Sequence, residues 1–303
     1  MTEVTIGIAA YNAENTLERA IDSALGQSFG GRYEIVVADD GSTDLTPNIA
    51  RSYALQFPDI VRFFRFENRG VATTRNSILK RARGTYMTWL DADDYYFPNK
   101  IDVQYRSVTS QEKLSNEKIS VFSNFLMGHE TYDFSQYEGD AVAAILRGEL
   151  RAYLWSSMMR TSHYRALNGF TESLHRSEDQ DLLIRFLLSG GKLHAIGGDA
   201  AMVYHFSTMR PGRHVEASLD FIVEKYGDLM KSLGIYDEYV PRRYWEIAGF
   251  YRANKDWDDM WRCRGMAVKL DHERYFPRLM ATIFQEVDGR VRTIMDATLR
   301  KTG

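Results

Sequence analysis

Residues 84–98 read Gly-Thr-Tyr-Met-Thr-Trp-Leu-Asp-Ala-Asp-Asp-Tyr-Tyr-Phe-Pro. The apolar run from Tyr86 to Leu90 is typical of a buried strand, and it leads directly into the carboxylates of Asp91, Asp93 and Asp94. Because an unpaired carboxylate is costly to desolvate, this acidic end must reach solvent, a cation or strong hydrogen-bond donors. Two aspartates separated by one residue can direct oxygens at one hard cation, and Mg²⁺ takes such ligands together with substrate phosphates. The stretch therefore predicts a metal–diphosphate site at a strand end of an α/β sheet. An acidic turn that caps the next helix is the alternative.

Strands and helices alternate on the amino-terminal side of this stretch. Apolar and β-branched runs predict buried parallel strands at 4–10, 34–38, 61–66 and 85–90. Apolar residues at helical spacing predict one helix behind a capping box at 15–18 and two more at 46–57 and 71–82. This alternation indicates a doubly wound α/β fold with polar turns at the carboxyl edge of the sheet.

The pattern changes after Pro98. We expect helices at 101–118 and 141–150, a strand at 121–126, an amphipathic helix from 178 that Gly190-Gly191 stops, and a last strand at 200–206. From about residue 214 the chain is helical and rich in aromatic residues, with a helical hairpin at 244–254 and 257–270. No second copy of this hairpin recurs at a fixed period.

Composition limits the class of protein. The 303 residues carry a net charge of −3, are 44% hydrophobic and 26% charged, and have no basic surplus that would indicate nucleic acid as a partner. The single cysteine, Cys263, excludes an internal disulfide and suits a reducing compartment. No secretory signal follows Met1, and no run of about 18 apolar residues is present. We therefore expect a cytoplasmic protein.

Six short segments carry a family resemblance: Ile6–Asn12, Ser23–Gln27, Asp39–Asp44, Gly70–Asn76, Leu90–Asp94 and Glu178–Asp179. In this order they resemble the motifs of the family 2 glycosyltransferases, over roughly residues 3–210. The resemblance implies a GT-A fold (a Rossmann-like, mostly parallel sheet with flanking helices), a nucleotide-sugar donor, Mn²⁺ or Mg²⁺, and inversion at the anomeric carbon. Residues 1–100 would then form the nucleotide-sugar-binding half, 101–213 the acceptor-side half of the same catalytic domain, and 214–303 a helical C-terminal extension without an assigned resemblance.

The donor site is expected at the first two strand ends. Tyr11 and Asn12 follow the first strand, where an aromatic ring and a polar turn would flank a base. In similar enzymes the second aspartate of the Asp-Asp-Gly-Ser turn, here Asp40, holds the base edge. A carboxylate accepts from uracil N3–H, which favours a UDP-sugar, although thymine presents the same edge. Asp-Gly-Ser is also a common turn sequence. Arg75 would contact phosphate or the base, or it is a solvated helix charge.

The resemblance assigns the acidic strand end to the nucleotide and the metal. Asp91 would face the ribose or nucleotide. Asp93 would bind Mn²⁺ or Mg²⁺ between the phosphates, where the ion acts as a Lewis acid on the leaving diphosphate. His205 stands where related enzymes have a histidine that reaches the metal or the diphosphate; a structural histidine after a strand is the alternative. Arg210 and Arg213 belong to a phosphate-covering loop or to a solvated basic loop.

Asp179 is the candidate general base. An acceptor hydroxyl loses its proton as it attacks, and a positioned carboxylate can accept that proton. Asp179 stands in the Glu-Asp context of the family at the start of the amphipathic helix. A first-turn acid that complements the helix dipole is the alternative. Glu178 would support or orient the base.

The function that follows is an inverting, metal-dependent transfer of one sugar to a glycan or lipid-linked saccharide, as in polysaccharide biosynthesis. The Gln-x-x-Arg-Trp signature and membrane helices of processive relatives do not occur in the sequence. The alternatives are a non-catalytic nucleotide-sugar-binding scaffold and a nucleotidyltransferase, which would need a Gly-rich basic loop where Tyr11-Asn12-Ala13-Glu14 stands. Apolar residues between Ile283 and Leu299, with basic neighbours, suggest peripheral contact with the inner face of a membrane; docking on the catalytic domain or on a second copy, as a homodimer, is the alternative. The sequence does not identify the sugar, the nucleotide, the acceptor or the linkage. It does not predict the oligomeric state either.

Overall fold

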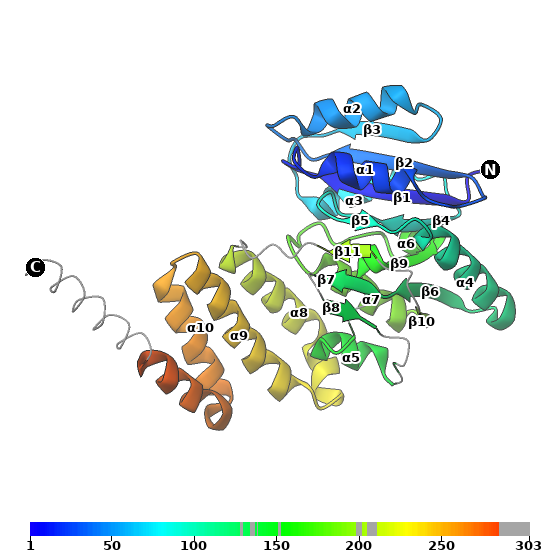
Figure 1. Cartoon of the computed structure of the whole chain (residues 1–303). Helices are drawn as coiled ribbons and strands as arrows, with labels where there is room; N and C mark the ends of the chain where they lie inside the picture. Colours follow the sequence, from blue (N-terminus) through cyan, green and yellow to red (C-terminus); the bar gives the residue numbers. More distant parts are fainter. Residues whose placement is uncertain are drawn as a thin grey trace, which may run out of the picture. The chain divides into compact units, whose positions relative to one another are not determined.

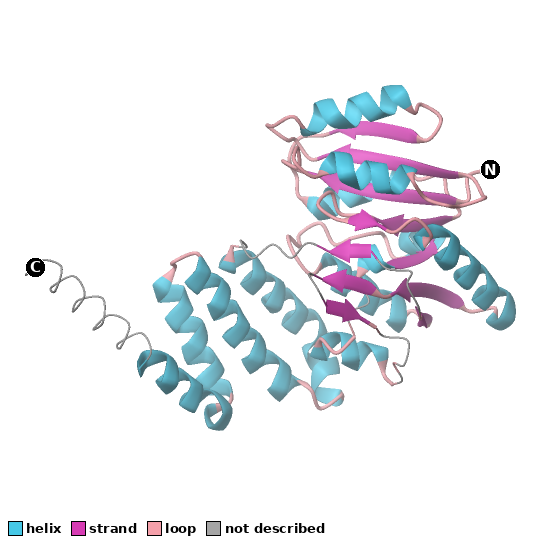
Figure 2. Cartoon of the chain, in the orientation of Figure 1, coloured by secondary structure: helices cyan, strands magenta, loops and turns pink. Residues whose placement is uncertain are grey.

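The computed structural model describes residues 1–127, 130–133, 137, 139–150, 153–197, 202–204 and 211–284. The chain divides into two compact units, Met1–Ser207 and Thr208–Gly303, which are treated separately below. Figures 1 and 2 show that all of the described strands lie in the first unit, whereas the described part of the second unit is helical.

The first unit is built on a mostly parallel sheet. Within the described residues, seven strands have the order β10-β6-β9-β4-β1-β2-β3, and only β9 runs antiparallel to its neighbours. Their bounds are β1 Val4–Ala10, β2 Tyr33–Asp39, β3 Val61–Arg65, β4 Tyr86–Trp89, β6 Lys118–Ser123, β9 Ser157–Arg160 and β10 Gly191–Ile196. A smaller sheet has the order β5-β11-β7-β8, with bounds Tyr95–Tyr96, Met202–Tyr204, Phe125–Met127 and Glu130–Tyr132. The expected α/β fold with a mostly parallel sheet is confirmed.

Helices cover both faces of the large sheet. One hydrophobic cluster joins β1 to side chains of three helices: α1 Leu17–Leu25, α2 Thr46–Gln56 and α4 Lys100–Ser115. A second cluster joins β2 and β4 to three others: α3 Val71–Arg81, α6 Thr161–Ala166 and α7 Glu178–Leu188. Neighbouring strand residues point to opposite faces, so Val36 and Val37 belong to different clusters. A strand buried on both faces reads as a continuous apolar run, which is why these strands were predictable.

Three local expectations differ from the structure. The capping box at 15–18 is wrong: α1 begins at Leu17, and Thr16, which precedes it, makes no side-chain cap. The carbonyl of Ala13 accepts the N–H groups of Thr16 and Leu17 instead, so a turn leads into the helix. The strand expected at 121–126 is divided between β6 and β7, which belong to different sheets. The edge strand β10 was not predicted.

Two short helical elements complete the first unit. Helix α5 covers Ala141–Arg147, where Asp140 accepts from the N–H groups of Val142 and Ala143. A 3-10 turn, η1, covers Leu154–Ser156 and leads into β9.

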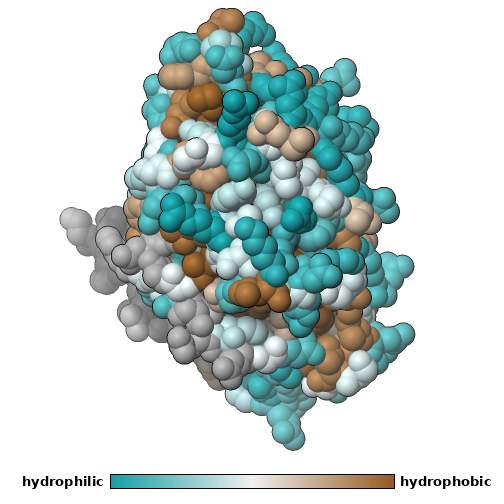
Figure 3. Space-filling view, turned by 90° about the vertical axis from the view of Figure 1, so that its right-hand side faces the viewer, coloured by the Kyte–Doolittle hydropathy of each residue, from teal (hydrophilic) through white to brown (hydrophobic). Residues whose placement is uncertain are grey.

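On the face drawn in Figure 3, the coloured hydrophobic residues lie in separate patches between hydrophilic ones.

The second unit contains the helices α8 Gly212–Ser232, α9 Tyr236–Ala253 and α10 Trp257–Leu270, followed by helical residues to 284. The expected hairpin is present, and its first helix begins earlier than predicted. Glu216 of α8 accepts from Tyr251 of α9 and from both Nη atoms of Arg262 of α10, each at 2.7 Å. These bonds join the three helices and lower the pKa of Glu216, with Arg262 the largest cause.

None of the helices in the described part of the chain has the length and apolar character needed to cross a membrane. Most of the segment expected to touch a membrane or a second copy, from Ile283 to Leu299, lies outside the described residues.

Candidate active site

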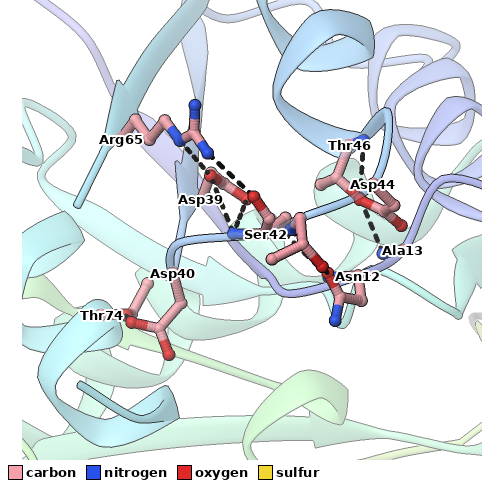
Figure 4. A network of polar contacts seen from close by, with 10 residues as sticks. Asn12, Ala13, Asp39, Asp40, Ser42, Asp44, Thr46, Arg65 and Thr74 are labelled. Atoms are coloured by element: carbon pink, nitrogen blue, oxygen red, sulfur yellow. Dashed lines mark hydrogen bonds and ion pairs between the residues drawn. The ribbon is translucent and has the colours of Figure 1, made fainter. Parts of the chain in front are cut away.

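The turn after β2 is held by polar contacts among its own residues and with Arg65 of β3 (Figure 4). Asp39 is fully buried, accepts from the N–H of Ser42 at 3.3 Å and pairs with Nε of Arg65 at 3.0 Å. Nη2 of Arg65 also donates to the carbonyl of Ser42 at 2.8 Å. Gly41 has φ +77°, and a Cβ there would lie 2.7 Å from the backbone N of Asn68, so only glycine fits. Asp39 is thus held inside the turn. Arg65 was not singled out from the sequence.

Asn12 joins the turns after β1 and β2 (Figure 4). Its backbone N–H donates to Oγ of Ser42, and its side-chain Oδ1 accepts from the N–H of Thr43, both at 2.9 Å. It adopts φ +47°, a conformation that asparagine tolerates better than most residues. The neighbouring Tyr11 is 51% exposed, which leaves its ring accessible at this strand end.

Asp40 fixes the start of α3. The residue is buried, with 5% of its surface exposed. Its Oδ1 accepts from the backbone N of Arg69 at 3.0 Å and from Oγ1 of Thr74 at 2.8 Å, and its Oδ2 accepts from the backbone N of Gly70 at 3.0 Å. Gly70 is the residue that precedes α3. The expected base-binding aspartate therefore has structural partners of its own.

Four residues from three elements meet at the carboxyl edge of the sheet. Arg75 of α3 binds Oδ1 of Asp91, which follows β4, through Nη2 at 2.8 Å. Through Nη1 it binds Glu178, the first residue of α7. The Arg75 side chain is 7% exposed and lies over the ring of Phe170. Asp179 is next to Glu178 and close enough for its charge to act on Arg75. The structure thus brings together Arg75, Asp91, Glu178 and Asp179, which we call the arginine–carboxylate cluster.

The cluster changes the acidity of two side chains, Asp179 and Arg75. Burial, followed by the charge of Glu178, raises the pKa of Asp179 to about 6, against the opposing charge of Arg75. The N–H of Gln180, which donates to Oδ1 of Asp179 at 2.8 Å, also opposes the rise. Burial would lower the pKa of Arg75, but the charges of Asp91, Glu178 and Asp179 outweigh it and raise that pKa. Arg75 is therefore permanently charged, whereas Asp179 titrates close to the range of a general base.

Asp93 lies on the exposed side of the acidic turn. Its backbone carbonyl accepts from Nη2 of Arg19 at 2.5 Å, which ties the turn to α1. Asp94 is buried, and its N–H donates to the carbonyl of Asp91 at 3.1 Å, which closes the turn. Within the described ranges, no group of three His, Cys, Asp or Glu side chains is arranged to hold a metal ion. His205 and Arg210 lie outside the described residues, and Arg213 is exposed on α8 of the second unit.

A buried lysine supports the end of β4. Lys100 is fully buried, and its Nζ donates to Oγ1 of Thr88 at 2.9 Å and to Oε1 of Gln104 at 2.8 Å. The Nζ atom lies 4.0 Å from the ring centroid of Tyr96, whose hydroxyl donates to the carbonyl of Trp89. Burial lowers the pKa of Lys100 well below its ordinary value. Nothing in the sequence distinguishes this lysine from the exposed ones.

Two aromatic residues that precede β9 are divided between core and surface. Trp155 is 5% exposed and packs edge-on against Phe125, with ring centroids 4.6 Å apart. Tyr153 is half-buried, and its ring centroid lies 4.9 Å from that of Trp155. Core packing therefore accounts for Trp155, and Tyr153 retains an accessible surface.

Asn76 ties α3 to the segment that leads into α7. Its Nδ2 donates to the carbonyl of Phe170 and to Oε1 of Glu172, each at 2.9 Å, and its Oδ1 accepts from the N–H of Phe170 at 2.8 Å. Gly169 has φ +68°, and a Cβ there would lie 2.3 Å from Oδ1 of Asn76. The approach to Glu178 thus depends on a glycine that no larger residue can replace without displacing Asn76.

Gly169→Ala should therefore destabilise the protein more than Gly190→Ala. Gly190 also has a positive φ, of +85°, but no atom lies within 4 Å of its Cβ position, so it measures the backbone strain alone. We expect the free energy of unfolding to fall by about 1–3 kcal/mol more for Gly169→Ala, the usual cost of overpacking. Equal losses in chemical denaturation would contradict the close contact with Asn76.

Comparison with known proteins agrees with this architecture. The sequence profile described as "Glycosyl transferase family 2" matches residues 5–124. The putative glycosyltransferase EpsE of Bacillus subtilis is 31% identical over 193 residues, which cover 62% of this chain and 68% of EpsE. The succinoglycan biosynthesis protein ExoO of Rhizobium meliloti is 31% identical over 219 residues, 67% of this chain and 60% of ExoO. The chain belongs to glycosyl transferase family 2.

Some relatives are much longer than the matched region. An uncharacterized glycosyltransferase of Rickettsia felis is 34% identical over 197 residues, 61% of this chain but 31% of that protein. For five Rickettsia glycosyltransferases, the match spans 26–58% of their length.

Solved structures share the fold at low sequence identity. The S. aureus TarS 1–349 structure has a TM-score of 0.59 and 18% identity, over 90% of this chain and 82% of that one. The mannosyltransferase PcManGT from Pyrobaculum calidifontis, solved with GDP-Man and Mn²⁺, has a TM-score of 0.58 and 16% identity, over 88% of this chain and 75% of that one. These similarities show a GT-A type fold.

Proposed function

We propose that this chain transfers a single sugar from a nucleoside diphosphate donor to a hydroxyl group of a glycan or lipid-linked saccharide, by direct displacement with inversion. The observation that carries the proposal is the arginine–carboxylate cluster. It contains a carboxyl group with a pKa of about 6 at the ligand-binding edge of a family 2 glycosyltransferase fold. The name of ExoO supports an acceptor of the polysaccharide class.

The donor we favour is a UDP-sugar. TarS has been solved with UDP and with UDP-GlcNAc, which supports uridine, whereas PcManGT has been solved with GDP-Man. In this chain the expected base contact is Asp40. Its Oδ2 accepts one bond, from Gly70, and a carboxylate oxygen has two lone-pair directions. A base N–H could therefore be accepted without loss of the contacts that order α3. Tyr11, Asn12 and Asp91 are the other residues proposed to line the nucleotide.

A divalent ion, Mn²⁺ or Mg²⁺, fits the residues that are present. Asp93 is an exposed acidic residue at the strand end, and His205 is the second proposed ligand. Mg²⁺ is commonly held by one or two carboxylates together with substrate phosphates and water, so a site without three protein ligands is adequate. When bound, the ion would stabilise the negative charge on the departing nucleoside diphosphate.

The chain's own residues then supply proton transfer and orientation. Asp179 accepts the proton of the attacking acceptor hydroxyl, and its raised pKa makes it a stronger base than an ordinary aspartate. Glu178 orients this region through its ion pair with Arg75. Direct displacement requires no covalent nucleophile, so one base is sufficient.

Calorimetric titration with UDP, dTDP, GDP and CDP, each with Mn²⁺ and with EDTA, tests the donor site. We expect binding of one uridine or thymidine diphosphate that requires Mn²⁺ and is lost in Asp93→Ala. Asp59→Ala, which removes an exposed acid from the loop before β3, should bind like the wild type. Binding that does not need the metal would contradict the role of Asp93. Binding without consumption of any nucleotide sugar would favour a non-catalytic scaffold.

A further inference from the structure

Arg75 is not placed as a free anion-binding side chain. Both terminal nitrogens of its guanidinium are bound to carboxylates, Asp91 through Nη2 and Glu178 through Nη1. The side chain is 7% exposed, and the ring of Phe170 lies 5.8 Å from its guanidinium carbon. A phosphate or base contact would need Arg75 to leave two buried partners, and breaking such pairs is costly. The sequence-based expectation that Arg75 binds phosphate or base is therefore less favoured than a role within the protein.

We propose that Arg75 is a positioning residue that holds the base Asp179 at a fixed place relative to the donor end of β4, by binding Glu178 and Asp91 at the same time. This inference rests on the proposed function. Its partners are 16 and 103 residues away in the sequence, so one side chain joins the strand end that precedes Asp93 to the first turn of α7. A planar guanidinium suits this task because its donors have a rigid geometry that an ammonium lacks.

The same contacts set the charge around Asp179. Three charged groups act on it: Glu178 and Asp91 raise its pKa, and Arg75 lowers it. The other elements packed on α7 also carry ionisable groups. In β10, Lys192 pairs with Glu117 and His194 contacts Gln111. In α6, the ring of His163 packs on Phe186, and α5 has Arg147 in its last turn. Removing Arg75 and removing the charge of Glu178 should therefore move the titration of Asp179 in opposite directions.

The test compares Arg75→Lys, Arg75→Gln and Glu178→Gln with the wild type. Arg165→Gln is the matched control, because Arg165 donates to two backbone carbonyls near the end of α3, those of Leu79 and Ala82, and to no carboxylate of the described residues. The first readout is the pH titration of the Asp179 carboxyl carbon by NMR, which does not depend on activity. The second is the pH profile of kcat/KM for sugar transfer.

We expect Arg75→Gln to raise the titration midpoint of Asp179 by about 1–3 pH units, the usual effect of one nearby opposite charge. Glu178→Gln should lower it, Arg75→Lys should lie between Arg75→Gln and the wild type, and Arg165→Gln should leave it unchanged. The acid limb of kcat/KM should shift in parallel. Unchanged midpoints in all variants would overturn the proposal.

The controls separate this inference from the proposed function. If Arg75→Gln does not fold, the midpoints of Arg75→Lys and Glu178→Gln still show whether Arg75 and Glu178 set the titration of Asp179. If the wild type transfers no sugar, the proposed function fails and the NMR midpoints alone judge the electrostatic role of Arg75. If the wild type transfers sugar while the midpoints stay fixed, only the role of Arg75 is wrong.

Discussion

Replacement of Asp179 by asparagine should lower kcat for sugar transfer by about 10²–10⁴-fold, the usual contribution of a general base. Asparagine has nearly the same shape, and its Oδ1 can still accept the N–H of Gln180, so the first turn of α7 should be kept. The amide cannot accept the acceptor's proton. Because the nucleotide is expected at Asp40, Asp91 and Asp93, binding of the nucleoside diphosphate with Mn²⁺ should be unchanged.

Gln180→Ala provides the neighbouring control for this result. It removes the adjacent side chain but retains the backbone N–H that contacts Asp179, so kcat should stay close to that of the wild type. Steady-state kinetics with the donor identified by calorimetry would measure both variants. Near-normal transfer by Asp179→Asn would show that the base lies elsewhere.

Transfer by the wild type should also fall steeply in acid. In the proposed mechanism the reaction needs the ionised carboxylate of Asp179, whose pKa is raised to about 6 by burial first and by Glu178 second. Below that pH the ionised fraction decreases tenfold for each pH unit, so kcat/KM should be about 100-fold lower two units below the pKa. The pH profile should lack this limb in the residual activity of Asp179→Asn. A wild-type profile that stays flat down to pH 4 would contradict the raised pKa.

The same pKa predicts the sign of a stability change. The folded state holds the Asp179 proton more tightly than the unfolded chain, whose carboxyl has the ordinary value of 3.8. Stability from this group is present below that value and is lost as the pH rises to about 6. At neutral pH the ionised Asp179 therefore destabilises the fold, and Asp179→Asn should raise the free energy of unfolding while it lowers kcat for transfer. Such a trade-off between folding stability and catalytic activity is common where an active site is strained.

The sequence best predicts the features that depend on residues close together in the chain. Strand β1 coincides with the expected 4–10, because a strand buried on both faces is continuously apolar. Strand β10 escaped prediction because it is a half-buried edge strand with polar Lys192 and His194, and its partner β6 lies far away in the chain. The capping box failed because its side-chain pattern also suits a turn, which the carbonyl of Ala13 completes.

Within the site, the sequence predicts residue types but not their directions. The family motifs identify Arg75 and Asp40, yet both side chains turn toward protein partners, Arg75 to Glu178 and Asp40 to the start of α3. Lys100 is the opposite case, since a side chain that is buried by tertiary packing has no local signature. The roles assigned to Asp91, Asp93 and Asp179 stay predictions, to which the structure adds the proximity of Asp91 and Asp179.

Because β9 runs antiparallel to β4, the segment before β9 lies at the carboxyl end of β4. Thr88 of β4 is opposite Met158, and its hydroxyl donates to the carbonyl of Ser157, so the chain enters β9 beside the donor edge. The turn η1 therefore lies next to the carboxyl end of β4, which Asp91 follows, while β9 itself pairs with β4 on one side and β6 on the other. In the proposed mechanism this edge faces the acceptor, so insertions or deletions just before η1 would change the acceptor side without shifting the register of the sheet. Acceptor preference could thus change between relatives while donor recognition stays the same.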